Sequence, residues 1–239
     1  MEHAARSSTD DPPVDALLVA PRTVHRVWLV RHGESTWNAL GLVQGHVTTP
    51  VLTSRGQRQA RRCAWALRGV RAAGVYASDL RRASQTANPI ARTLGVDVQL
   101  HAGLRERSLG VAEGLPASML RREWTGIADG RVVDADAAPP GGESVRDLYA
   151  RATRWVAALL ERHGRHDVVL VCHGGVVRVV QAWAEGIGPD EMAWGPVENG
   201  LIVSCRAPAL RRTGQILCPH DGRLEGNQRD VATTKGALV

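Results

Sequence analysis

The most constraining feature of this sequence is a short apolar run with polar neighbours on both sides, DVVLVC at residues 167–172. A run of this length and composition is typical of a strand that is covered on both faces of a sheet. A second run, at residues 24–30, is rich in β-branched residues and has the same character. Further strands are predicted at residues 74–78, 96–100 and 201–205.

Helical patterns separate these runs along the chain. The clearest lies at residues 144–163, where apolar residues recur on one face and Ser144 with Asp147 fits a capping box. Because strands alternate with helices, we expect an α/β fold, a three-layer α/β/α sandwich with a mostly parallel sheet flanked by helices. The other helices are predicted at residues 54–68, 82–94 and 176–184.

The length of 239 residues suits one sizeable domain. We expect this domain at residues 23–206, preceded by a flexible polar extension at residues 1–22. Residues 207–239 form a C-terminal tail whose structure the sequence does not indicate. Residues 103–142 show little periodicity and predict a long excursion of the kind that often carries function.

Arginine dominates the charge of the chain. The formal net charge is +6, and Lys235 is the only lysine among 30 basic residues. Guanidinium groups favour anionic ligands, because their planar fork fits phosphate oxygens. The arginines are spread along the chain without a recognition motif or interleaved aromatic residues, so nucleic acid is not an expected partner.

Cysteine usage and the N-terminus bear on the compartment. The four cysteines form no CxxC pair, which favours free thiols and argues against structural zinc. No apolar run approaches the ~20 residues of a membrane span. The N-terminal segment lacks the basic region of a secretion signal. We therefore expect a cytoplasmic protein without a membrane partner.

Histidine followed by glycine stands at the end of both principal strand candidates, as Arg-His-Gly at residues 31–33 and His-Gly-Gly at residues 173–175. Ligands of parallel α/β sheets bind beyond the carboxyl ends of the strands, so we expect the two imidazoles to meet there. Glycine beside an imidazole lets backbone N–H groups approach an anion closely. One such histidine is more often structural than catalytic, and only the repetition of the pattern favours a site.

The segment LVRHGESTWN, residues 29–38, resembles the signature of the histidine phosphatase superfamily, which also includes cofactor-dependent phosphoglycerate mutase. Four further segments occur in the family's order: SDLRRASQTA, LRE, GGES and VCHGG. Each is weak alone, but the set is specific and covers about residues 24–205. The resemblance implies an enzyme that works through a phosphohistidine intermediate and needs neither a metal nor a cofactor.

The resemblance also implies roles for individual residues. His32 is the expected nucleophile, and Glu106 the general acid that protonates the leaving group and then activates water. Arg31, Arg82 and His173 would supply a positive field around the phosphate. The substrate-binding residues would be Gly33, Asn38, Gln44, Gly45 and Gly174.

The sequence also leads to expectations about the orientation of the arginines next to Glu106 and Arg82. We expect Arg105 and Arg107 to point away from Glu106, because cations directed inward would disfavour a proton-donating carboxyl. Arg81, the neighbour of the expected site residue Arg82, is assigned to the surface.

The sequence after Glu106 favours one branch of the family. It reads RSLGVAEGLP, whose G-x-x-E-G pattern is similar to the phosphatase branch, rather than the HYGxLxGLNK-type stretch of the mutase branch. We therefore expect metal-independent hydrolysis of a small phosphate ester. A phosphoglycerate mutase-type phosphotransferase and an inactive module that binds phosphorylated ligands are the alternatives. Which substrate is used, and whether the chain forms a homo-oligomer, stay open.

Overall fold

A computed structural model describes residues 26–164, 166–206 and 212–217. Its main sheet has six strands in the order β3-β2-β6-β1-β7-β8. Strands β3, β2, β6 and β1 pair in parallel, whereas β7 is antiparallel to both β1 and β8. The strands are β1 (Arg26–Arg31), β2 (Ala72–Ala77), β3 (Val98–Leu100), β6 (Asp167–Cys172), β7 (Ile202–Arg206) and β8 (Arg212–Leu217).

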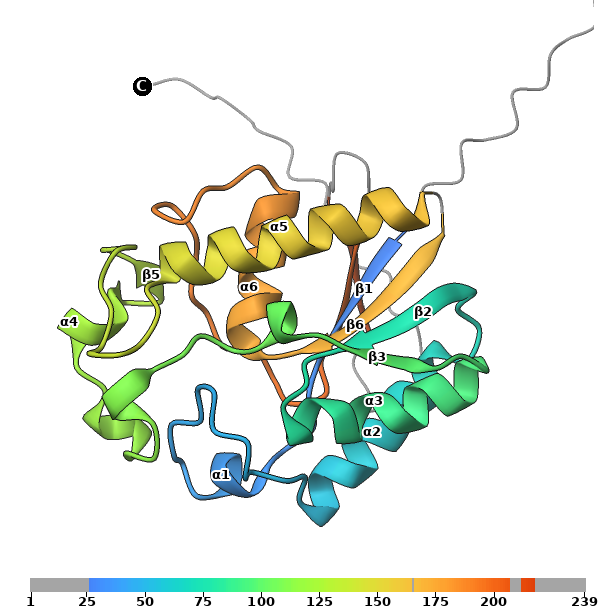
Figure 1. Cartoon of the computed structure of the whole chain (residues 1–239), viewed down its shortest axis with the longest axis horizontal. Helices are drawn as coiled ribbons and strands as arrows, with labels where there is room; N and C mark the ends of the chain where they lie inside the picture. The colour runs from blue at the N-terminus through green and yellow to red at the C-terminus, as the bar shows by residue number, and fades with distance from the viewer. Residues whose placement is uncertain (1–25, 165, 207–211, 218–239) are drawn as a thin grey trace, which may run out of the picture.

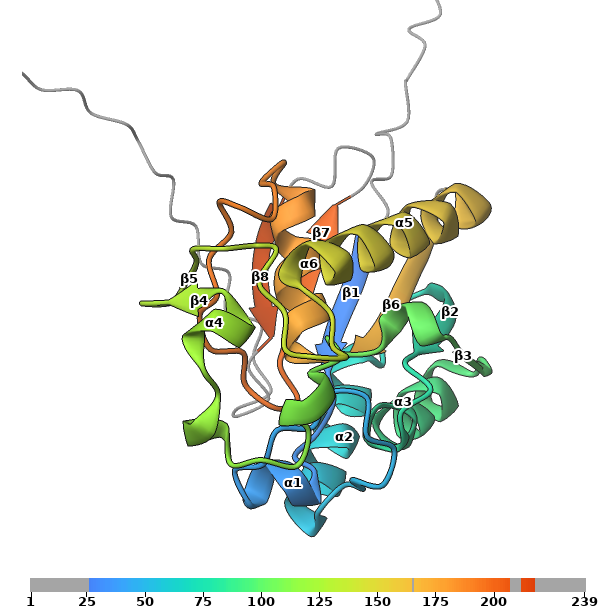
Figure 2. The same ribbon diagram turned by 60° about the vertical axis from the view of Figure 1, so that its left-hand side comes forward.

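Two pairs of helices cover the sheet. Helices α2 (Ser54–Leu67) and α3 (Arg81–Leu94) lie on one face, and α5 (Val145–His163) and α6 (Gly174–Ala184) lie on the other (Figures 1 and 2). The capping box predicted at the start of α5 is present, with both Ser144 and Asp147 bonded to backbone N–H groups. The three-layer α/β/α architecture expected from the alternating pattern is confirmed.

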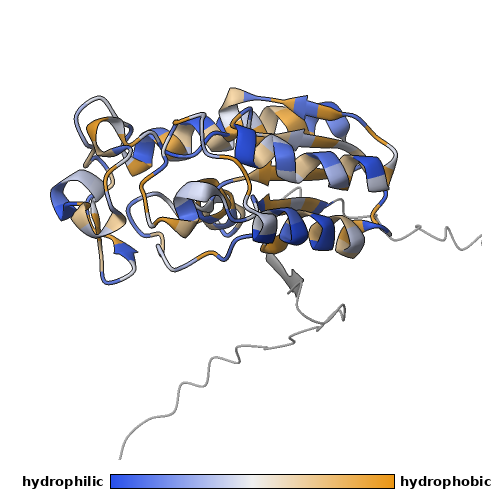
Figure 3. Cartoon of the chain, turned by 90° about the horizontal axis from the view of Figure 1, so that it is seen from below, coloured by the Kyte–Doolittle hydropathy of each residue, from blue (hydrophilic) through white to orange (hydrophobic). Residues whose placement is uncertain are grey.

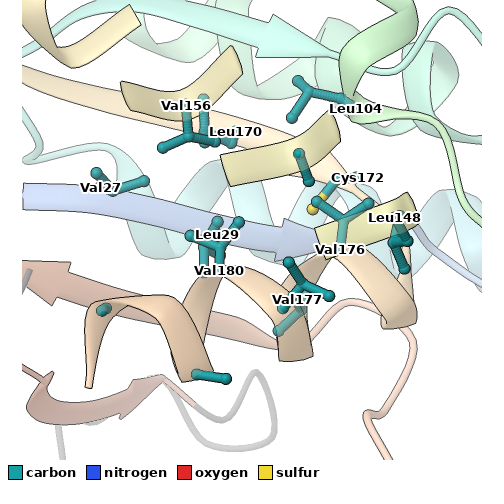
Figure 4. Close-up of a cluster of buried hydrophobic side chains, with 14 of the residues drawn as sticks. Val27, Leu29, Leu104, Leu148, Val156, Leu170, Cys172, Val176, Val177 and Val180 are labelled. Atoms are coloured by element: carbon teal, nitrogen blue, oxygen red, sulfur yellow. The ribbon is translucent and has the colours of Figure 1, made fainter. Parts of the chain in front are cut away.

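The core explains why the central strands read as continuous apolar runs. Val27 and Leu29 of β1 pack with α5 and α6 (Figure 4), whereas Trp28 and Val30 pack with α2 and α3. Successive strand residues point to opposite faces, so a strand covered on both faces buries all of them. Figure 3 shows these mostly hydrophobic strands between helices that carry hydrophilic residues on their outer sides.

The predicted excursion is ordered and contains short elements. A hairpin of β4 (Ile127–Ala128) and β5 (Arg131–Val132) is tied to a later loop, because Trp194 N–H donates to the carbonyl of Gly130 at 2.7 Å. This segment, green in Figure 1, lies to one side of the sheet. The remaining short helices are α1 (Thr36–Ala39), η1 (Ala102–Leu104), η2 (Gly110–Ala112), η3 (Ala117–Met119) and α4 (Arg122–Thr125).

The predictions for the termini are only partly within the described residues. The extension at residues 1–22 lies outside them, and residues 212–217 of the tail form β8 at the sheet edge. Among the described cysteines, Cys63 and Cys172 are free thiols, and both are buried, as is Cys205. None of the helices in the described ranges is long and apolar enough for a membrane crossing.

Candidate active site

The two predicted histidines lie together at the carboxyl ends of adjacent parallel strands. His32 follows β1 and His173 follows β6, and the register pairs Arg31 with Cys172. The two ring centroids are 5.0 Å apart, with the rings edge to face. Both side chains are buried, His32 at 3% and His173 at 0% exposure. The sheet topology therefore brings together two imidazoles separated by most of the chain.

The backbone fixes the tautomer of His32. Its Nδ1 lies 2.7 Å from the carbonyl oxygen of Gly33, which can only accept a hydrogen bond. Nδ1 must therefore carry the proton, and Nε2 keeps its lone pair when the ring is neutral. Gly33 is required in turn, because a Cβ there would lie 2.4 Å from the carbonyl oxygen of Gly56.

Burial keeps both imidazoles neutral. Loss of water, followed by the charges of Arg82 and Arg31, lowers the pKa of His32 well below its ordinary value of 6.5. Burial and Arg82 likewise lower the pKa of His173. A neutral His32 with an unprotonated Nε2 is the form that can act as a nucleophile.

The depressed pKa values predict how stability depends on pH. In the unfolded chain both rings ionise near pH 6.5, so below that pH the unfolded state binds more protons than the folded state. The free energy of unfolding should therefore fall as pH drops through 6.5. His173→Gln removes one such group and should make the fall less steep. Urea unfolding of both proteins at pH of about 7.5 and about 5.5 measures this change in the free energy of unfolding.

The matched control for this experiment is His166→Ala, since His166 is exposed. That variant should keep the pH dependence of the original chain. An equally steep dependence in His173→Gln would contradict the assignment of a neutral, buried His173.

Two arginines are directed into the same region. Arg82 on α3 is 1% exposed, and its Nη1 and Nη2 donate to the carbonyls of Val47 and Gly45, both at 2.9 Å. Arg31 donates through Nη1 to the carbonyl of Val197. Burial lowers the pKa of Arg82 to about 10, so it stays charged at neutral pH.

Several buried nitrogens in this region lack a partner. Within the described residues, Nε of Arg31, Nε of Arg82 and both ring nitrogens of His173 make no hydrogen bond to protein. Buried polar groups without partners are rare, because leaving them unpaired costs about 1–3 kcal/mol each. A ligand with phosphate oxygens would supply acceptors for the two guanidinium Nε–H groups and for the single N–H of a neutral His173 ring.

Both the carboxylate and the backbone carbonyl of Glu106 accept hydrogen bonds. Its Oε1 accepts the N–H of Arg107 at 2.8 Å, and its Oε2 accepts the N–H of Gly175 at 3.0 Å. A Cβ on Gly175 would lie 2.2 Å from Oε1, which explains the second glycine after His173. The carbonyl of Glu106 accepts from His46 at 2.7 Å and from Arg151 at 3.1 Å.

These side chains share one pocket of about 220 Å³. All five predicted catalytic residues line it, together with Gln44 and Gly45. Its other walls are mostly apolar. The residues that the sequence analysis did not place there are Val43, Arg107, Leu109, Ala117, Leu120, Thr125, Ile127, Arg178 and Trp194.

The other three predicted substrate residues are not among those that line the pocket. Asn38 lies in the capping box of α1, where its Oδ1 accepts from Ser35 and, at 3.2 Å, from Asn199. Gly33 donates its N–H to Thr86 Oγ1 at 3.0 Å. Gly174 begins α6 and is not among the lining residues.

The expectation that both neighbours of Glu106 point away is wrong for Arg107. Arg105 does pair with Asp79, at 2.7 Å from Nε to Oδ1. Arg107, in contrast, is 3% exposed and lines the pocket, because the carbonyls of Trp124 and Thr125 accept from its guanidinium at 2.8 and 2.9 Å. The surface assignment of Arg81 is confirmed.

Arg178 is the clearest residue that sequence reasoning missed. It follows Gly174 by four residues on α6, so one helical turn returns it to the side of the pocket. Asn199 was missed too, and its side-chain N–H donates to the carbonyl of His32 at 3.0 Å. The helical spacing could have indicated Arg178, whereas no local signal marks Asn199.

Fold and site together define an α/β protein in which two buried histidines and two arginines line one pocket at the carboxyl ends of parallel strands. The chain belongs to the histidine phosphatase superfamily (branch 1), whose family model matches residues 27–209.

Relatives carry two kinds of name. Phosphoglycerate mutase-like protein 4 of Arabidopsis thaliana is 40% identical over 155 residues, covering 63% of this chain and 66% of the relative. A probable phosphoglycerate mutase GpmB of Salmonella paratyphi C is 34% identical over 175 residues, covering 67% and 78%. The structure of a mycobacterial glucosyl-3-phosphoglycerate phosphatase matches with a TM-score of 0.66 at 28% identity, covering 77% and 90%.

Proposed function

We propose that this chain is a phosphatase that hydrolyses a small phosphate monoester through a phosphohistidine on His32. The observation that carries the proposal is the fixed tautomer of His32, whose Nδ1 faces the carbonyl of Gly33 at 2.7 Å. Its Nε2 lone pair is thereby available in a pocket that Arg31, Arg82 and His173 also line.

The first step transfers the phosphoryl group to the enzyme. Nε2 of His32 attacks phosphorus and forms the P–N bond while the bond to the leaving oxygen breaks. Arg31 and Arg82 stabilise the charge on the equatorial oxygens. Glu106 gives its proton to the departing oxygen, so the leaving group departs as an alcohol.

The second step releases phosphate. Glu106, now a carboxylate, takes a proton from water, and the resulting oxygen attacks phosphorus. The P–N bond breaks and returns neutral His32 together with inorganic phosphate. Splitting the displacement into two steps lowers the barrier of each, and the same residues serve both because Glu106 changes from acid to base.

Hydrolysis is favoured over phosphoglycerate interconversion by the G-x-x-E-G pattern after Glu106, which is similar to the phosphatase branch of the family. Within the G-x-x-E-G pattern, Glu113 Oε1 accepts the N–H groups of Leu109 at 2.9 Å and His46 at 2.8 Å. A Cβ on Gly45 would lie 2.0 Å from the same oxygen. The phosphatase-type loop therefore packs directly against the pocket wall formed by Gln44 and Gly45.

The relatives' names make a mutase the second candidate, and one assay set separates the two. We expect phosphate release from p-nitrophenyl phosphate that is unchanged by EDTA, because the proposed groups are all protein side chains. We also expect release from phosphoglycerates to exceed their interconversion after priming with a bisphosphate. Interconversion faster than release would overturn the hydrolase assignment, and loss of activity in EDTA would overturn its independence of metal.

A further inference from the structure

The GGES segment at residues 141–144 is used by neither of the two chemical steps. Its last residue caps α5, so the segment lies directly before that helix. Gly142 permits close packing there, because a Cβ would lie 2.8 Å from the carbonyl oxygen of Ser108. The N–H of Glu143 donates to this carbonyl at 2.9 Å, and the N–H of Ser108 donates to Oε2 of Glu143 at 3.0 Å. The GGES segment is therefore bonded to the chain just after the proposed acid.

The carboxylate of Glu143 also binds Arg151, which follows it by 8 residues on α5. Nε of Arg151 donates to Oε1 at 2.8 Å, and Nη2 donates to Oε2 at 2.7 Å. Although burial alone would raise the pKa of Glu143, the hydrogen bonds from Arg151 and from the N–H of Ser108 hold it below its ordinary value. Two parallel bonds between planar groups fix the orientation of the guanidinium.

The remaining donors of Arg151 bind the backbone that carries the proposed acid. Nη1 donates to the carbonyls of Gly103 and Arg105, both at 3.1 Å. Nη2 donates to the carbonyl of Glu106, also at 3.1 Å. With the two bonds to the carboxylate, these three bonds engage all five N–H donors of the guanidinium. Residues 105–109 belong to no helix or strand, so these bonds hold a segment that lacks the regular ones.

The placement of the Glu106 carboxyl depends on this segment. Its Oε2 accepts the N–H of Gly175 on α6 at 3.0 Å, while the carbonyl of the same residue accepts from Arg151 and His46. A proton donor works only within hydrogen-bond reach of the leaving oxygen, and a displacement of about 1 Å can cost about 10²-fold in rate. Loss of the bonds from Arg151 would release the backbone from which the carboxyl projects.

We propose that Arg151 and Glu143 are positioning residues for the general acid, and that they act on the first chemical step through the placement of Glu106. This rests on the proposed function, since it takes Glu106 as the group that protonates the leaving oxygen. The GGES segment then serves leaving-group departure rather than phosphate binding. Loss of the pair should impair esters whose leaving group needs a proton more than esters whose leaving group departs readily as an anion.

The test compares phenyl phosphate with p-nitrophenyl phosphate, whose nitro group makes the leaving anion more stable. Because kcat/KM covers the steps up to departure of the leaving group, the ratio of kcat/KM for the p-nitrophenyl ester to that for the phenyl ester measures the need for the acid. Arg151→Met should raise this ratio about tenfold or more, a part of the about 10²–10⁴-fold that a general acid contributes. Arg151→Lys, which keeps a cation there, should raise the ratio less.

Two further variants calibrate this ratio. Glu106→Gln removes the acid itself and should raise the ratio at least as much as Arg151→Met does. In that background Arg151→Met should change the ratio no further, because both substitutions act through one carboxyl. The matched control is Arg154→Met, which changes an exposed arginine on α5 and should keep the original ratio.

Equal losses with both esters in Arg151→Met would show a purely structural role and would overturn the inference, and so would an unchanged ratio. If Arg151→Met does not fold, Glu143→Gln decides, because it keeps one acceptor for Arg151 but loses the charge. A raised ratio in that variant supports the inference, and an unchanged one rejects it. Failure of the proposed function has a different signature: the ratio stays unchanged in Glu106→Gln, or neither ester releases phosphate, and the inference falls with it.

Discussion

His32→Ala should lower kcat with p-nitrophenyl phosphate by about 10⁴-fold or more, the size seen when a nucleophile is removed from a covalent mechanism. The lone pair on Nε2 has no substitute at that position, because His173 belongs to another strand end and its ring centroid is 5.0 Å away. Steady-state rates at saturating substrate measure the effect.

The control for this variant is His166→Ala, which removes an exposed imidazole and should leave kcat unchanged. Circular dichroism and the thermal midpoint show whether His32→Ala keeps its fold. A folded His32→Ala protein that retained more than about a tenth of the original kcat would exclude His32 as the nucleophile.

Arg82→Met should lower kcat/KM by about 10³-fold or more, by analogy with arginines that stabilise the transition state of phosphoryl transfer. Methionine keeps much of the apolar stem but removes the charge and the donors to Gly45 and Val47. The loss should appear in kcat as well as KM, because the charge on the equatorial oxygens develops most fully in the transition state.

The neighbouring arginine provides the control for this prediction. Arg81→Met changes an exposed side chain on the same helix turn and should leave kcat/KM unchanged. If Arg82→Met reduced kcat/KM by less than about tenfold while Arg81→Met reduced it more, the family position assigned to Arg82 would be wrong.

Much of the fold could be predicted because the signals are local. The run at residues 167–172 is buried on both faces, and its burial pattern leaves only Asp167 partly exposed. The strand ends then placed His32 and His173 correctly, since parallel neighbours end at the same edge of a sheet. Periodicity and capping are properties of adjacent residues, so one sequence suffices to find them.

What the sequence did not reveal depends on contacts between distant segments. Arg107 turns inward because carbonyls of residues 124 and 125 accept its donors, and nothing near Arg107 in the sequence signals those acceptors. Asn199 supports His32 across a separation of 167 residues. The excursion at residues 103–142 showed little periodicity because it is built from single turns and a short hairpin.

The loop before β7 links these long-range contacts. Its carbonyls at Gly195 and Val197 accept from Arg178 and Arg31, and Asn199 binds the backbone of His32. The same loop contacts the excursion, because the backbone N–H of Val132 donates to the carbonyl of Met192 at 3.2 Å. A segment without any sequence motif thus positions three of the charged or nucleophilic groups.

The most direct test of the account is to trap the covalent intermediate. Rapid quenching with a radiolabelled phosphate ester should give labelled protein whose phosphate is lost in acid and retained in alkali, as a P–N bond requires. Peptide mapping should place the label on His32, and the label should be absent from His32→Ala. A label on any other residue, or product formed in a first turnover without labelled protein, would contradict the account.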